Sequence, residues 1–134
     1  MRGRKPSTIM SGSSPVTEIP KPPSYMSKDA KAEWRRVAPI LITERKTLTE
    51  ADLATLENYC LATGTMRQAQ RILNLEGLVT PDGKRHPAFG IMNAAQTTQR
   101  LCAAELGLTP VSRSRPAVRN DDGDDDELGA LFGK

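Results

Sequence analysis

Four of the side chains that could do chemistry are basic and recur at helical spacing. Lys28, Lys31, Arg35 and Arg36 share one side of a helix with about 3.6 residues per turn, although two carboxylates interrupt that side. Lysine and arginine arranged in this way bind phosphate groups through charge, without reading base sequence. A solvated helix face is the alternative interpretation, and charge alone does not separate the two.

More basic residues lie toward both ends of the chain. Residues 1–48 carry ten Lys/Arg against four Asp/Glu, residues 77–119 carry six against two, and residues 120–134 carry one against six. Two basic blocks and an acidic end indicate a polyanion partner and a separate docking segment. The basic candidates outside the first helix are Arg2, Arg4, Lys5, Arg113 and Arg115.

The acidic end also contains apolar residues at helical spacing. Leu128, Leu131 and Phe132 stand at i, i+3 and i+4, directly after the acidic run at 121–127. This pattern predicts a short amphipathic turn that binds a groove on a partner protein. A solubilising tail and a tail that folds back on the basic arm to weaken DNA binding are the alternatives.

Motifs for catalysis and metal binding are missing from the sequence. It has no Gly-x-x-x-x-Gly-Lys-Ser/Thr phosphate loop, no His-Glu-x-x-His motif and no Gly-x-Ser-x-Gly elbow. His86 is the single histidine, which excludes sites that need two; a capping role and a ligand contact stay open for it. The acidic run has its glycine at the wrong position for an EF-hand loop. We therefore expect no catalysis, no cofactor and no metal.

The longest uninterrupted helical pattern runs from Thr49 to Gly77 and is the expected scaffold. Thr49 and Asp52 resemble a capping box, and Gly77 tolerates the left-handed conformation that ends a helix. Its roughly 26 residues span about 39 Å, more than a compact domain of this size needs, so we expect partners along its length. Gly64, near its middle, indicates a kink, a close approach of another backbone or a tolerated glycine.

Two shorter helices flank this scaffold. The first begins after Ser27, its N-cap, and Pro39 predicts a kink or a restart through residues 40–45. Pro87 opens the last helix, which runs to about Leu106. Between the second and third helices, the flanks of a Pro-Asp-Gly turn at residues 81–83 could pair as a very small β-hairpin.

Each of the two flanking helices has a predicted apolar row. In the first helix the row is Ala30, Trp34, Val37, Ala38 and Leu41. In the last helix it is Ile91, Ala95, Thr98, Cys102 and Leu106, supported by Met92 and Leu101.

The predicted fold is all-α, with a three-helix core around the long central helix. We expect a flexible basic and proline-rich arm at residues 1–26, a helical oligomerisation and DNA-binding domain at residues 27–110, and an Arg/Ser segment with an acidic tail at residues 111–134. Only 37% of residues are hydrophobic and 4% aromatic, so a small core completed by oligomerisation is expected. Two cysteines on apolar rows indicate reduced core residues. No stretch is apolar enough to suggest secretion or a membrane span.

The order of several motifs resembles one known family. The stretch AELGLTPVSRSR at residues 104–115 is similar to the end of the helical domain in small terminase subunits of tailed double-stranded-DNA bacteriophages. Supporting features are the Gly-Arg-Lys-Pro start, the proline-rich segment before Ser27, Trp34, LTEAD at residues 48–52, and His86 followed by Pro87. The resemblance covers about residues 2–115 and leaves the acidic tail outside.

This resemblance implies a DNA-packaging factor in the cytoplasm of a bacterial host. Such a subunit binds double-stranded viral DNA near the packaging start and delivers it to the large terminase subunit, which holds the ATPase and nuclease. It is not itself an enzyme. The resemblance also implies a homo-oligomer, a closed ring of about nine subunits. Two other functions stay open from the residues alone: a dimeric helix-turn-helix transcription regulator and a structural head adaptor.

Overall fold

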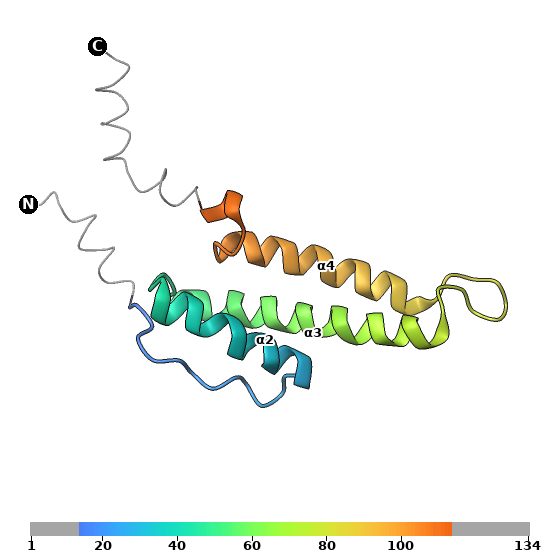
Figure 1. Ribbon diagram of the computed structural model, residues 1–134, viewed down its shortest axis with the longest axis horizontal. Helices are drawn as coiled ribbons and strands as arrows, with labels where there is room; N and C mark the ends of the chain where they lie inside the picture. Colours follow the sequence, from blue (N-terminus) through green and yellow to red (C-terminus); the bar gives the residue numbers. More distant parts are fainter. Residues whose placement is uncertain (1–13, 114–134) are drawn as a thin grey trace, which may run out of the picture.

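The structure, a computed structural model, describes residues 14–113 and contains three main helices. These are α2 (Lys28–Pro39), α3 (Leu53–Glu76) and α4 (Pro87–Glu105). Figure 1 shows α3 in the middle, with α4 running back along its length and α2 covering its first half on the other side. The described part of the chain is all-α, without a regular strand, as predicted.

The first helix begins and ends where local signals predict. The Ser27 hydroxyl accepts the Ala30 N–H at 3.1 Å, and α2 ends at Pro39. A π-helical segment, η1 (Ile40–Glu44), follows directly, so the helical hydrogen-bond pattern changes at Pro39, where the sequence predicted a kink or a restart. The predicted apolar row is confirmed: Ala30, Trp34, Val37, Ala38 and Leu41 are all buried.

The central helix also matches its predicted extent. A short 3₁₀ turn, η2 (Glu50–Asp52), leads into α3, and the Asp52 carboxylate accepts the Thr49 N–H at 3.0 Å and the Thr49 hydroxyl at 2.9 Å. Gly77 ends the helix with φ 86°, in the region that favours glycine. The long scaffold is therefore defined at both ends by residues that are its immediate neighbours in sequence.

The buried row of α4 differs from the predicted one. Ile91 is 53% exposed and Leu101 56% exposed, and Thr98 also faces solvent. Ala95, Cys102, Leu106 and the supporting Met92 are buried as predicted, whereas Ile91, Thr98 and Leu101 were wrong. The row that packs on α3 has Ala88 and Ala103 in their place. Small side chains predominate in it, which allows the two helices to approach closely. The buried residues are Ala88, Met92, Ala95, Cys102 and Ala103.

The connection from α3 to α4 is a small hairpin-like turn. Val79 and Arg85 form an isolated antiparallel bridge, and the His86 N–H donates to the Leu78 carbonyl at 2.8 Å. The Gly83 N–H, donating to the Thr80 carbonyl at 2.8 Å, closes the turn. The predicted pairing is thus present as a single bridge rather than as two strands.

Helices α2 and α3 form an antiparallel pair. Asp29 contacts Arg71, and Arg36 contacts Tyr59, so the contacts move back along α3 as they move forward along α2. The pair contacts along the whole length of α2, unlike helix-turn-helix elements, whose axes cross at about 90–120°. This arrangement argues against the helix-turn-helix regulator.

Gly64 allows the close contact between these two helices. A Cβ at position 64 would lie 2.7 Å from the Ser27 hydroxyl oxygen and 2.9 Å from the Ala30 backbone nitrogen. Both distances are shorter than van der Waals contact. Of the three interpretations of Gly64, namely a kink, a close approach of another backbone or a tolerated glycine, the close approach is therefore confirmed.

The segment before α2 packs against the helices. Val16 and Met26 are buried, the Val16 N–H donates to the Leu48 carbonyl at 3.0 Å, and the Trp34 indole N–H donates to the Pro20 carbonyl at 2.8 Å. Trp34 is thus a core anchor, as its place on the apolar row indicated. Within the predicted arm, residues 14–26 contact the helical domain; the domain boundaries themselves stay a prediction.

We expect Gly64→Ala to destabilise the protein by up to about 2 kcal/mol. Overpacking typically costs about 1–3 kcal/mol, which outweighs the roughly 1 kcal/mol that alanine gains in a helix interior. Gly90 in α4 is the matched control, because a Cβ there would meet no atom within 4 Å. Urea unfolding should show Gly90→Ala stabilised by up to about 1 kcal/mol. Equal effects at the two positions would contradict the proposed role of Gly64.

Candidate nucleic-acid interface

Three of the predicted phosphate-binding residues form an outward-facing stripe on α2. Lys28 and Arg35 are exposed and Lys31 is half-buried, and their spacing places them on the side of α2 away from its buried row. None of the three has a carboxylate within ion-pair distance among residues 14–113. We call this set, Lys28, Lys31 and Arg35, the α2 stripe.

Arg36, the fourth predicted residue of this face, has a different role. Its guanidinium donates two hydrogen bonds to the Glu33 carboxylate, at 3.0 and 2.6 Å, although its own side chain remains 59% exposed. Glu33 is only 1% exposed, so Arg36 neutralises a charge that is removed from water. The structure therefore separates Arg36 from the α2 stripe. Whether it also contacts a phosphate stays a prediction.

Two side chains of α3 complete the environment of Glu33. The Tyr59 hydroxyl donates to the carboxylate at 2.6 Å, and Arg67 approaches it at 3.3 Å. Burial alone would raise the pKa of Glu33, but hydrogen bonds from Arg36 and Tyr59 and the charges of Arg36 and Arg67 outweigh it, so the pKa is lowered. Burial and the bond to Glu33 raise the pKa of Tyr59 to about 12. The carboxylate thus stays ionised inside the bundle.

A second ion pair joins the same two helices near the start of α2. Arg71 donates to both carboxylate oxygens of Asp29, and this hydrogen bond lowers the pKa of Asp29. Both side chains are partly exposed, so the pair contributes little to stability. The pair nevertheless matches the charge of Arg71 with a carboxylate at the surface between α2 and α3.

His86 is a structural residue in this fold. Its Nδ1 accepts the Ala88 N–H at 3.0 Å and caps α4, and its Nε2 lies 2.7 Å from a Glu76 carboxylate oxygen. Since Nδ1 is an acceptor here, Nε2 carries the proton and donates to Glu76. The capping interpretation of His86 is confirmed.

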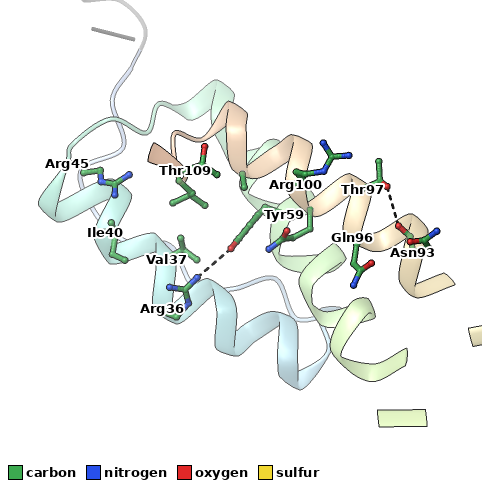
Figure 2. A pocket seen from close by; sticks show the side chains of 13 residues that line it. Arg36, Val37, Ile40, Arg45, Tyr59, Asn93, Gln96, Thr97, Arg100 and Thr109 are labelled. Carbon is green, nitrogen blue, oxygen red and sulfur yellow. Dashed lines mark hydrogen bonds between the residues drawn. The ribbon is translucent and has the colours of Figure 1, made fainter. Parts of the chain in front are cut away.

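A groove separates α2 from α4 on one side of α3 (Figure 2). It has a volume of about 650 Å³, and the α4 side presents amide and hydroxyl groups. Arginines stand on both sides, with Arg36 and Arg45 opposite Arg100 in the view of Figure 2. The sequence analysis did not single out Arg45 and Arg100, because the residues of this groove come from segments that are far apart in the sequence.

Apolar side chains are exposed mainly on α3, α4 and the turn between them. Beyond the reach of α2, α3 and α4 pack only on each other around a small cluster of Ala69, Leu73, Ala88 and Met92. A two-helix pair cannot bury all its apolar side chains, and several face solvent in the described structure. They are Leu75, Leu78, Val79 and Ile91. Leu101 is also exposed, but it lies at the other end of α4, beside Cys102 and Ala103 of the three-helix core.

The remaining predicted site residues stay predictions. Arg113 is exposed and donates to the Leu108 carbonyl at 3.4 Å. The others lie outside the described residues: Arg2, Arg4, Lys5, Arg115, Leu128, Leu131 and Phe132.

Within residues 14–113 there is no group of three or more His, Cys, Asp or Glu that could hold a metal ion. No helix in that range is both long and apolar enough to cross a membrane.

The geometry defines the class of protein: a small helical bundle whose basic residues are divided between internal ion pairs and the outer surface. The family model for the small subunit of phage terminase matches residues 30–123. The chain therefore belongs to the phage terminase small-subunit family, a family of viral DNA packaging whose members are generally non-catalytic. The match begins inside α2 and extends past Arg115 into the acidic run. No curated protein and no solved structure matches the chain significantly.

We expect Glu33→Gln to lower the free energy of unfolding by about 2–4 kcal/mol at neutral pH, because it leaves charged partners around an uncharged group. Because the pKa of Glu33 is lowered in the folded state, the ionised carboxylate stabilises the protein above about pH 4.5, its ordinary pKa. This stabilisation is lost as the pH falls through the pKa of the folded state. The difference between wild type and variant should therefore narrow below about pH 4.5 in urea unfolding. The control is Glu44→Gln, an exposed carboxylate, with an expected change within about 0.5 kcal/mol. A pH-independent difference would contradict the ionised state of Glu33.

Proposed function

We propose that this chain binds double-stranded viral DNA near the packaging start and delivers it to the large terminase subunit. The large subunit would supply the ATPase and nuclease, and this chain would supply DNA contacts and assembly. The observation that carries the proposal, beside family membership, is the α2 stripe. It is a row of cations that form no ion pair within residues 14–113, on a helix that is otherwise firmly packed.

The division of the basic residues supports this assignment. Arg36, Arg67 and Arg71 form ion pairs with Glu33 and Asp29 of α2. The α2 stripe has no such use, and an exposed cation is available to a phosphate oxygen. Because α2 is fixed on α3, the stripe would meet the DNA backbone as a preset array, and its binding would weaken with salt. The terminal candidates, Arg2, Arg4, Lys5, Arg113 and Arg115, would add contacts of the same kind.

Self-association is the second part of the proposal. The apolar residues exposed at the two-helix end of the molecule, among them Leu75 and Ile91, provide surface for a second copy. A shallow groove between α3 and α4, lined by small residues such as Ala62, Ala94 and Ala95, would admit a neighbouring helix closely. We propose that copies join through these surfaces into a closed ring in the host cytoplasm, with residues 128–132 contacting the large subunit.

We expect reversal of Lys31 and Arg35 to Glu to weaken binding to a DNA duplex at least about tenfold at moderate salt. Each lost phosphate contact should also lower the slope of log affinity against log salt by about one. The measurement is fluorescence anisotropy over a salt series. Circular dichroism should show the helices unchanged, because neither side chain joins the Glu33 network.

The matched control reverses Lys84 and Arg85, which lie on the exposed α3–α4 turn and change the net charge equally. The control should retain most of the affinity. Equal losses in both variants would mean that binding depends on overall charge, and unchanged binding in the α2 variant would refute the α2 stripe as the DNA contact.

We expect the protein to form one discrete assembly, whose native mass is a multiple of the 14.6 kDa monomer mass. Replacing Ile91 with Lys should break it into smaller species, because a charge would have to be buried in the interface. Native mass spectrometry gives both results. A monomer for the unaltered chain, alone and with DNA or the large subunit, would contradict the ring.

A further inference from the structure

The groove between α2 and α4 is a cationic site that the DNA-binding proposal does not use. We call it the arginine groove, after Arg36, Arg45 and Arg100. No acidic residue lines it among the described residues, and the other polar groups on its α4 side are amides and hydroxyls. They are Asn93, Gln96, Thr97 and Gln99. Such a lining fits an anionic, hydrogen-bonding ligand.

The positive charge of the groove is largely unmatched. The Arg100 side chain makes no hydrogen bond or ion pair to any described residue, and the Arg45 side chain uses one N–H to reach the Gly107 carbonyl at 2.7 Å. Each guanidinium has about five N–H donors, so both retain donors for a ligand. Arg36 contributes less, because Glu33 offsets its charge. Arg45 and Arg100 therefore carry the site.

The chain leaves the described structure beside this groove. Leu108 and Thr109 line it, and the Arg113 N–H donates to the Thr109 carbonyl at 2.9 Å, so residue 113 lies one helical turn beyond. Seven residues then lead to the acidic run at residues 121–127. At about 3.3–3.6 Å per extended residue they span up to roughly 25 Å. The run can therefore reach the groove of its own chain.

We propose that the acidic segment, residues 121–127, docks in the arginine groove of the same chain. It carries six carboxylates, which match the fork geometry of arginine. Because the segment is tethered to the bundle, docking is intramolecular, and the tether gives the segment a high effective concentration at the groove. Exposed ion pairs are weak without such a tether. The groove is a half-open hollow of about 650 Å³ between α2 and α4, which suits a single extended peptide. A duplex is a broad rigid cylinder, whose phosphates suit the outward-facing α2 stripe.

Docking has a regulatory consequence that rests on the proposed function. Docking keeps the six carboxylates of the acidic segment close to the helices that carry the α2 stripe. Their negative charge repels the DNA phosphates and lowers the affinity for DNA. A partner that binds the neighbouring residues 128–132 would withdraw the segment and raise DNA affinity. The docking itself does not depend on DNA binding and is tested without DNA.

The first test is carbodiimide coupling of the full chain carrying Arg100→Lys, which keeps the charge and adds an amine at the groove. The control is Arg35→Lys on the α2 stripe. Mass spectrometry should find position 100 joined to residues 121–127 at least about fivefold more often than position 35, within one chain when labelled and unlabelled copies are mixed. Equal coupling, no coupling, or coupling only between copies would overturn the proposal.

The second test is a double-mutant cycle on DNA affinity. Neutralising the segment, with Asn for each Asp and Gln for Glu127, should tighten DNA binding about threefold or more; with Arg45→Gln and Arg100→Gln present, that gain should largely disappear. If the two arginine substitutions instead weaken DNA binding equally with either tail, the groove holds a DNA phosphate and the proposal is wrong. A chain that couples at position 100 but binds no DNA would retain the docking and refute the proposed function.

Discussion

The structure depends on a carboxylate that is buried between two helices. Glu33 is 1% exposed, and it is stable there only because Arg36, Tyr59 and Arg67 surround it with donors and positive charge. These partners come from both α2 and α3, so the ionised state of one side chain requires the two helices to be aligned. Gly64 makes this alignment sterically feasible, because it lets the start of α2 lie directly on α3.

The same alignment decides which basic residues can act outside the bundle. A helix that contributes cations to an internal network has fewer to offer a partner, and α2 contributes Arg36. The α2 stripe lies on the opposite side of the helix, where its charges form no ion pair with any residue that the structure describes. One helix thus combines a buried face that holds the bundle together and an outer face suited to a polyanion. Such rigid placement favours a defined array of phosphate contacts.

The bundle is uneven along its length, and this affects assembly. Near η1 and the last described residues three helices share one core, whereas at the other end α3 and α4 stand alone around a small cluster. Apolar side chains are left exposed at this two-helix end because no third helix covers them. The arginine groove, with Arg45, Leu108 and Thr109 in its lining, reaches the three-helix end. Self-association and tail docking would therefore use different parts of the molecule.

The sequence by itself determined the helices, their ends and the family. The residues at the ends of the helices act on backbone groups only a few residues away, so their effects can be predicted from the sequence. They are Ser27, Thr49 with Asp52, Gly77 and His86. Only the tertiary structure decided which arginine neutralises Glu33, which row of α4 is buried and where a groove forms. Ile91 and Met92 are both plausible core residues on a helical pattern, and the packing of α4 on α3 decides that Met92 is buried and Ile91 exposed. Glu33 and Arg67 are 34 residues apart, and their contact exists only once α2 and α3 pack.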